Sequence, residues 1–337
     1  MSRPSGSVDI ESHYVPALLL DAYRQAPPGS NGAALAARSA AWAASPTAGN
    51  SRFALIGEIE ARIAEMDEAG VALTLLSVAA LPDYPSDPAA AAPVADLASR
   101  CNDELLAAAA SQPGRLAMLA SLPFPYVEQC LAELDRLAGE ELFKGVIAHC
   151  ATSNYMLDRA DLQPVYERVA ALGRPLLIHP GGEGVQAHPM FAQWTLNGSV
   201  AAMVETTTTA ARLMLSGMLD RVPELVLIVP HLGGTLPYLV GRLGDQSGTG
   251  DAEHDVLHYL EHRVRLGTCS FHHPALHCAV ATVGAENVIL ATDFPYRGTL
   301  MRAVDHIRDS ALPEEQQLAI LGGNAARLGL SLASAVV

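Results

Sequence analysis

Five residues that can bind a metal ion or transfer protons lie at the ends of short apolar runs in this chain. Glu11 and His13 follow the first run, His179 and His231 end two later runs, and Asp293 follows the last one. Carboxylate oxygens and imidazole nitrogens without thiolates suit zinc or manganese and argue against a soft-metal site. A single histidine at a strand end is more often a hydrogen-bonded core or loop residue. The hypothesis of a metal site therefore depends on where the strands place these residues.

The apolar runs are rich in Val, Ile and Leu and alternate with longer stretches of helical periodicity, which predicts repeated strand and helix units. Strands buried on both faces and joined by helical crossovers should be parallel, and eight of them close into a barrel. We therefore predict an α/β fold, a single (β/α)8 TIM barrel spanning residues 1–337, in preference to a doubly wound sheet. The predicted strands are 8–10, 71–77, 116–121, 145–148, 175–179, 225–231, 264–267 and 288–291.

Helices are predicted between these strands from the spacing of apolar residues. In 59–69, Ile59, Ile63 and Met66 share one face, and Gly70 follows at the expected stop position. The other predicted helices are 94–111, 127–137, 162–172, 199–216 and 274–283. Residues 27–52, rich in Gly, Ser and Ala, are predicted to be an insertion after the first strand, over the barrel mouth. Residues 245–255 are predicted to be a polar loop.

Barrel enzymes place their chemistry at the carboxyl ends of the strands, so the polar residues found there should meet at one rim. Residues two apart in an extended segment point to the same side, so Glu11 and His13 can both face the barrel mouth. We expect these two residues to hold one divalent ion, zinc or alternatively manganese, together with His179 and Asp293. The remaining coordination positions are left open for water or substrate.

His231 belongs to the same rim and precedes Leu232, Gly233 and Gly234. Beside a metal ion, its imidazole can orient water, polarise a carbonyl group or stabilise developing negative charge. The alternative is a further ligand in a binuclear site. Lys144, the one lysine in the chain, is the residue that would have to supply a bridging carboxylated group, but it lies at the wrong end of its strand.

The composition excludes several classes of protein. With 21 Lys+Arg and 36 Asp+Glu, the formal net charge is −15, which disfavours nucleic acid as a partner. Half of the residues are hydrophobic and 17% are charged, so a large core is available and extensive disorder is excluded. No apolar run is long enough to span a membrane and no signal pattern opens the chain, so we expect a cytoplasmic protein. The five cysteines lack Cys-x-x-Cys spacing and are predicted to be reduced and mostly buried.

Motifs along most of the chain resemble those of the decarboxylase branch of the amidohydrolase superfamily, which includes aminocarboxymuconate-semialdehyde decarboxylases and γ-resorcylate decarboxylases. Glu11-x-His13 is similar to the γ-resorcylate type, whereas the run from His231 to Gly234 resembles the aminocarboxymuconate type. The other matching segments are 9–16, 62–67, 70–71, 176–180, 205–206, 216–221, 230–242, 291–296 and 323–327.

The resemblance implies that Glu11, His13, His179 and Asp293 hold one metal ion and that His231 is the catalytic histidine. It also implies a homodimer in which Arg242 reaches the neighbouring subunit's site and binds a substrate carboxylate; the alternative is a surface ion pair on a helix. Arg52 lies near the position of the family's other carboxylate-binding arginine. Trp194 is placed to stack on an aromatic substrate or simply to pack.

These residues predict a metal-dependent, non-oxidative decarboxylase that acts on an ortho-hydroxybenzoate-like or unsaturated carboxylic acid and needs no organic cofactor. The metal ion would act as template and Lewis acid, Asp293 would deliver the proton, and His231 would stabilise charge on the ring oxygen. The alternative is a hydrolase of amides, lactones or related esters, with Asp293 as general base and His231 polarising the carbonyl. A non-catalytic barrel is a third possibility, and it predicts no stoichiometric metal ion.

Overall fold

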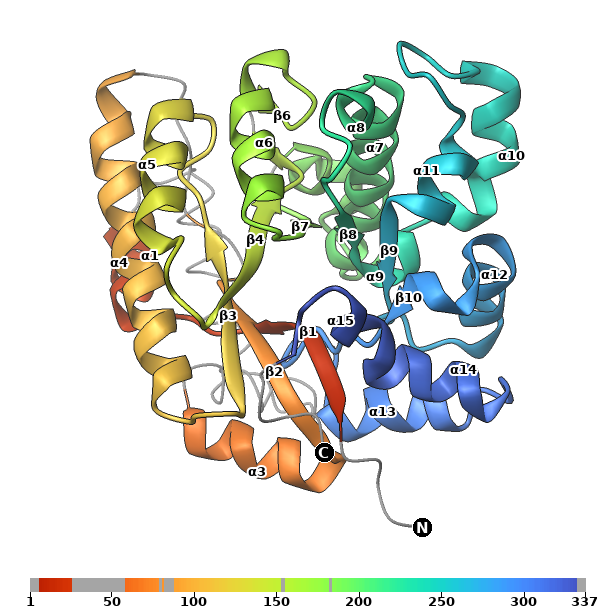
Figure 1. Cartoon of the computed structure of the whole chain (residues 1–337), viewed down its shortest axis with the longest axis horizontal. Coiled ribbons are helices and arrows are strands. Elements are labelled where there is room, and N and C mark those ends of the chain that lie inside the picture. Colours follow the sequence, from red (N-terminus) through yellow and green to blue (C-terminus); the bar gives the residue numbers. More distant parts are fainter. Residues whose placement is uncertain are drawn as a thin grey trace.

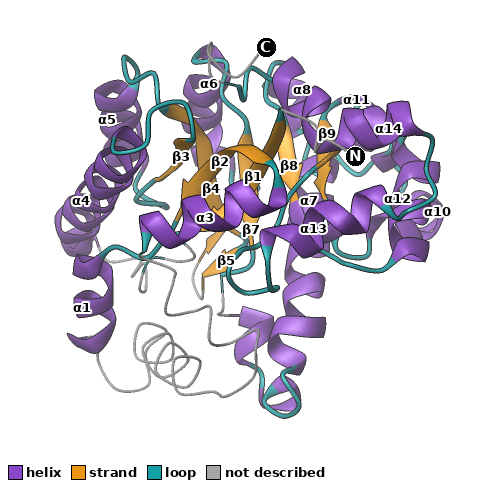
Figure 2. Cartoon of the chain, turned by 90° about the horizontal axis from the view of Figure 1, so that it is seen from below, coloured by secondary structure: helices purple, strands orange, loops and turns teal. Residues whose placement is uncertain are grey.

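The computed structural model describes residues 6–25, 58–78, 81, 88–152, 155–181 and 184–331. In this part of the chain eight strands form one sheet in the order β1-β2-β3-β4-β7-β8-β9-β10, and each pair of neighbours is parallel. The strands lie inside a surrounding layer of helices (Figures 1 and 2), which confirms the predicted (β/α)8 barrel. The strands are β1 (Ser7–His13), β2 (Val71–Ser77), β3 (Leu116–Ser121), β4 (Phe143–His149), β7 (Leu176–His179), β8 (Leu227–Val229), β9 (Val264–Gly267) and β10 (Val288–Ile289).

The segment after β10 closes the barrel against β1. The backbone N–H of Ile10 donates to the carbonyl of Leu290 at 3.1 Å, and that of His13 donates to the carbonyl of Phe294 at 2.7 Å. Ser12 and Phe294 also form an isolated parallel bridge. The first and last strands therefore meet at a seam that carries polar residues from both.

The helices follow the strands in the alternation that the sequence predicted. Those described are α1 (Ala17–Gln25), α3 (Ile59–Ala69), α4 (Ala91–Ala110), α5 (Val127–Leu137), α6 (Gln163–Ala171), α7 (Ala202–Leu215), α8 (Met218–Arg221), α9 (Pro230–Gly233), α10 (Leu236–Ser247), α11 (Val256–His262), α12 (His273–Val283), α13 (Leu300–Arg308), α14 (Glu314–Leu318) and α15 (Asn324–Arg327). A small antiparallel pair, β5 (Ala151–Thr152) and β6 (Tyr155–Met156), follows β4. The remaining short turns of helix are 88–90, 160–162, 184–187, 189–191, 197–201, 285–287 and 319–323.

Two apolar layers result from the alternation of side chains along the strands. One fills the barrel interior, and the other lies between strands and helices. In β2, Leu73 and Leu75 face the interior, while Leu76 packs toward the helices. In β2 both faces are thus largely apolar, which is why this strand appears in the sequence as a nearly continuous hydrophobic run; β1 differs, because Asp9, Glu11 and His13 occupy one of its faces.

Several predicted boundaries are confirmed, and others are wrong: the first strand spans Ser7–His13 where 8–10 was predicted, and the last ends at Ile289 where 291 was predicted. Strands 71–77, 116–121 and 264–267 and helices 59–69 and 127–137 have the predicted bounds, and Gly70 ends its helix in the left-handed conformation (φ 73°). The predicted strand 225–231 is too long, because β8 ends at Val229 and a proline-led turn follows. The predicted loop 245–255 begins too early, since α10 continues to Ser247.

The predicted insertion at residues 27–52, which includes Arg52, lies outside the described residues. Within the described ranges, no helix combines the length and hydropathy that crossing a membrane requires. The cysteines are all free there, with Cys101, Cys130, Cys150 and Cys269 buried and Cys278 exposed, as predicted.

Candidate metal and catalytic site

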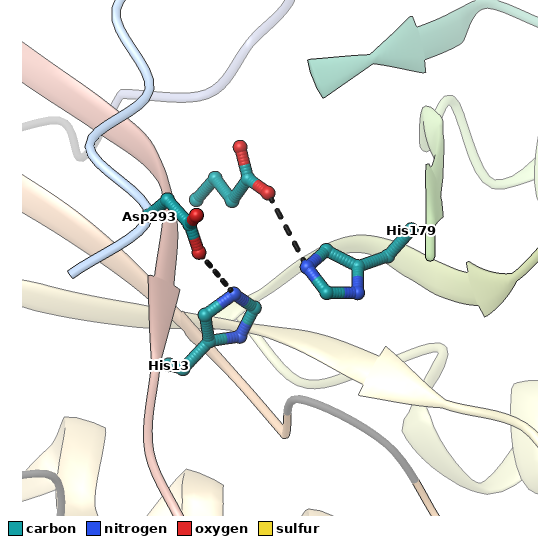
Figure 3. A group of neighbouring side chains, drawn as sticks. His13, His179 and Asp293 are labelled. Atoms are coloured by element: carbon teal, nitrogen blue, oxygen red, sulfur yellow. Dashed lines mark hydrogen bonds and ion pairs between the residues drawn. The ribbon is translucent and has the colours of Figure 1, made fainter. Parts of the chain in front are cut away.

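Four residues from three places in the sequence meet at the rim of the barrel. Glu11 and His13 end β1, His179 ends β7, and Asp293 follows β10. Their donor atoms all lie within 4.8 Å of one another, and all four side chains are almost completely removed from solvent. Figure 3 shows the Asp293 carboxylate and the two imidazoles pointing toward one another. The structure therefore brings together the four residues that the strand ends predicted.

The hydrogen bonds of these residues leave ligand atoms facing the centre of the group. Nδ1 of His179 lies 2.9 Å from the carbonyl oxygen of Pro180 and donates to it, so Nε2 carries the free lone pair. That Nε2 is 3.5 Å from Oε1 of Glu11. Oε1 is buried and has no hydrogen-bond partner among the described residues. Nε2 of His13 lies 3.1 Å from Oδ1 of Asp293.

This group fits a divalent metal ion. A buried carboxylate oxygen without a partner is costly, and a cation satisfies it. Two imidazole nitrogens and two carboxylate oxygens are ligands suited to zinc or manganese. Glu11, His13, His179 and Asp293 would hold the ion.

His231 lies beside this group rather than within it. Its Nε2 is 3.4 Å from Oδ2 of Asp293, on the side of the carboxylate away from His13. His231 (φ 56°) and Leu232 (φ 55°) both have left-handed backbone, and so does Asp293 (φ 54°). Such conformations are costly for residues other than glycine and are concentrated at functional sites. The turn after β8 thus aims the imidazole at Asp293.

Burial and neighbouring charges shift the protonation equilibria of the site. Burial raises the pKa of Glu11, although the charges of His231 and His13 oppose the shift. Burial would also raise the pKa of Asp293, but the hydrogen bonds with His13 and His231 hold it well below its usual range. Burial would lower the pKa of His231, but its bond with Asp293 and the charge of Glu11 raise it instead. The pKa of His179 falls well below its usual value, chiefly through burial. A neutral His179 is the form that binds a metal ion.

Arg62, on α3, contacts residues in or next to the site on both sides of the seam. Its side chain is fully buried and donates hydrogen bonds to the Ser12 hydroxyl and the His13 carbonyl. Its guanidinium also lies over the Phe294 ring, 4.8 Å from the centroid. Burial lowers the pKa of Arg62 to about 10. One cation therefore contacts both sides of the seam that carries His13 and Asp293.

Asp9, also buried, ties the same seam together. Its carboxylate accepts hydrogen bonds from the backbone N–H and the hydroxyl of Thr292, at 3.0 and 2.8 Å, and from the N–H of Glu11 at 3.2 Å. Burial raises the pKa of Asp9 to about 7 despite these bonds. These bonds fix Asp9, two residues before Glu11, relative to Thr292, the residue before Asp293.

The three predicted substrate residues are not part of the buried group. Arg242 is exposed on α10, and Trp194 is 82% exposed, so Trp194 does not pack in the core of this chain. Arg52 lies outside the described residues. Their predicted roles stay predictions.

Two polar residues near the site were not predicted from the sequence to belong to it. Cys269 follows β9, and its thiol contacts Glu11 and the backbone of His231. Arg297 follows Asp293 by one turn, with its N–H 3.2 Å from the Asp293 carbonyl, and its charge acts to lower the pKa of His231. Both residues lie beyond the end of a predicted strand, and this position in the sequence could have marked them as candidate site residues.

The other rim histidines have structural contacts. His273 stacks on His306 of α13, with ring centroids 4.5 Å apart, and lies within hydrogen-bonding distance of its carbonyl. His277 likewise contacts the carbonyl of Ser310. His149, at the end of β4, is buried with its ring centroid 5.9 Å from that of His179.

The sequence pattern of the amidohydrolase family matches residues 8–328. This chain belongs to the amidohydrolase family. It is 28% identical over 298 residues to the γ-resorcylate decarboxylase of Polaromonas sp. strain JS666, covering 82% of this chain and 89% of that one. It is also 28% identical over 238 residues to the 2-amino-3-carboxymuconate-6-semialdehyde decarboxylase of Dictyostelium discoideum, covering 68% and 65%.

A solved structure extends these similarities to the fold of this chain. The dihydroxybenzoic acid decarboxylase of Polaromonas sp. JS666, solved with bound manganese and the inhibitor 2-nitroresorcinol, superposes with a TM-score of 0.79. The two chains are 26% identical, and the match covers 99% of each. These three relatives are decarboxylases, which are carboxy-lyases.

Proposed function

We propose that this protein is a metal-dependent, non-oxidative decarboxylase of an aromatic acid with a hydroxyl group ortho to the carboxylate. The observation that carries the proposal is the buried group of Glu11, His13, His179 and Asp293 with His231 beside it, 3.4 Å from Asp293. The similarity to decarboxylases of hydroxybenzoates supports this choice over hydrolysis.

The four-residue group would hold one divalent ion. When bound, the ion supplies Lewis-acid chemistry and orients a substrate carboxylate with its adjacent oxygen. The manganese in the Polaromonas structure supports manganese here. The donor set also suits zinc, so the assay described below compares protein loaded with zinc and protein loaded with manganese.

Asp293 is the residue proposed to deliver the proton. As the bond between the ring carbon and the carboxyl carbon breaks, its electron pair takes up a proton at the ring carbon, and carbon dioxide leaves. The pair of Asp293 and His231, whose Oδ2 and Nε2 are 3.4 Å apart, holds that proton and is refilled from solvent. His231 also stabilises negative charge on the ring oxygen. No electrons are gained or lost overall.

Arginines are proposed to bind the substrate carboxylate or a second acidic group. Within one subunit the candidate is Arg297, one turn beyond Asp293, because its charge reaches His231. A guanidinium group matches a carboxylate through paired hydrogen bonds. Arg297→Gln should raise KM more than it lowers kcat, which steady-state kinetics would measure.

Arg242 is the candidate from a neighbouring subunit of a homodimer. It lies one turn beyond Tyr238 on α10, and Tyr238 is 84% exposed. An exposed aromatic side chain beside an arginine is typical of protein interfaces. Sedimentation equilibrium should give a dimer, and Arg242→Ala should raise KM without changing the mass of the assembly.

The deciding assay compares two reactions of the protein loaded with manganese or zinc. We expect carbon dioxide release from 2,6-dihydroxybenzoate or 5-carboxyvanillate, the acids for which two decarboxylases of similar structure are named, and no acid release from a panel of amides and lactones. Asp293→Asn should lower kcat by about 10²-fold or more, the usual size of an acid–base contribution. Cys278→Ser, an exposed change on α12, is the matched control. Hydrolysis of an amide or lactone without carbon dioxide release would reverse the assignment.

A further inference from the structure

Cys269 occupies a position in the site that the decarboxylation mechanism does not use. Its side chain is completely buried after β9. The thiol donates a hydrogen bond to Oε2 of Glu11 at 3.0 Å and accepts one from the backbone N–H of His231 at 3.1 Å. The sulfur atom therefore lies between the first metal group and the catalytic histidine.

The two oxygens of Glu11 face different neighbours. Oε1 is directed to His179 and the first metal group, whereas Oε2 is directed to Cys269. Glu11, His231 and Cys269 form a second group whose donor atoms all lie within 4.8 Å of one another. Glu11 is thus shared by two sets of donors, as a carboxylate is when it bridges neighbouring metal ions.

His231 also carries a buried polar atom that no hydrogen bond within the described ranges satisfies. Nδ1 of His231 is buried and has no hydrogen-bond partner among the described residues, while the whole side chain is 7% exposed. Sulfur, imidazole nitrogen and carboxylate oxygen together suit zinc or cadmium, because soft thiolate ligands select such cations. Manganese prefers oxygen and nitrogen and is disfavoured here.

We propose that Glu11, His231 and Cys269 form a second cation site, specific for thiophilic divalent ions, next to the first. Binding forms a metal–sulfur bond and releases the thiol proton to solvent, with no change of oxidation state. The cation engages His231 and so stops turnover. Excess zinc therefore inhibits, whereas excess manganese does not. The binding rests on the donor groups alone, and the inhibition rests on the proposed function.

Cadmium is the probe, because a cadmium–thiolate bond gives an ultraviolet charge-transfer band that other ligands do not. Manganese-loaded protein carrying Cys278→Ser, which removes the exposed thiol, is titrated with Cd²⁺ and its retained metal is counted by mass spectrometry. We expect a thiolate band that saturates at one Cd²⁺ per chain. The parent protein should retain one more ion than the Cys269→Ala variant, which should lack the band. Cys269→Ser should also lose the band, and it provides the test if Cys269→Ala does not fold.

Two results would overturn the proposal: no thiolate band in the parent protein, or a band that persists after Cys269→Ala. Activity is a separate readout. Each protein is compared with its own rate without cadmium, and the cadmium concentration for half inhibition should rise at least tenfold in Cys269→Ser. If no substrate is decarboxylated by any manganese-loaded protein, the proposed function fails, while the absorbance still decides whether the second site exists.

Discussion

Nε2 of His13 lies 3.1 Å from Oδ1 of Asp293, although the two residues are 280 positions apart in the sequence. The contact exists because the segment after β10 pairs with β1, where Ser12 faces Phe294. The proposed ligand group therefore spans the closing seam of the barrel. It is complete only when the barrel is closed, so metal binding by this group would be coupled to the stability of the fold.

Removal of the metal ion should destabilise the protein. Without a cation, the buried Glu11 carboxylate has an oxygen with no partner, and a ligand that binds only the folded state adds stability. At about 100 times Kd the ion contributes about 2.7 kcal/mol. Scanning calorimetry should show a lower Tm after chelation and recovery on adding manganese. An unchanged Tm in protein shown by metal analysis to be metal-free would contradict the assignment of these ligands.

Arg62→Met should destabilise the barrel and weaken metal binding. The change removes the hydrogen bonds to the Ser12 hydroxyl and the His13 carbonyl and leaves buried polar groups unpaired. The expected loss is about 2 kcal/mol or more in the free energy of unfolding. Urea denaturation measures it. Arg24→Met, which breaks an exposed ion pair with Asp21, is the control and should cost less than about 1 kcal/mol. Equal losses in the two variants would exclude a special role for Arg62.

Gly234→Ala should be far more harmful than Gly241→Ala. Gly234 has φ 64°, and a Cβ atom there would lie 2.6 Å from the Thr207 hydroxyl and 2.8 Å from the Met203 carbonyl. Gly241 lies within α10 with nothing within 4 Å of an added Cβ. The first change should cost about 1–3 kcal/mol, and the second should stabilise by up to about 1 kcal/mol. Thermal unfolding of both variants tests this, and a stable Gly234→Ala protein would show that the turn can shift.

His306→Gln should make the protein less sensitive to acid. Burial, with the charges of His273 and Arg302, lowers the pKa of His306 in the folded protein to about 4, against 6.5 for an ordinary histidine. Because the unfolded chain binds the proton more readily, stability is complete above about pH 6.5 and falls as the pH drops toward 4. Urea unfolding at several pH values should show a shallower decline for the variant. His188→Gln, at an exposed histidine elsewhere, is the control; parallel slopes for wild type and His306→Gln would refute the prediction.

Much of the fold could be predicted from hydrophobic patterning. Strand β2 and helix α5 have the predicted bounds because a buried parallel strand is a continuous apolar run and an amphipathic helix repeats every three or four residues. The end of β8 could not be placed from the apolar run LVLIVPH. There, Pro230 and the left-handed backbone of His231 end the strand, and that backbone is held by tertiary contacts such as the one with Cys269.

The kinds of donor and their positions at strand ends follow from the amino-acid sequence, since residue type and local periodicity can be read along the chain. Which atoms meet depends on the folded barrel. It placed the Cys269 thiol on one oxygen of Glu11 and His179 beside the other, and it put Arg62 under the seam. Such contacts depend on how the closed barrel packs, because a shift of one or two ångströms breaks a hydrogen bond that no sequence spacing records.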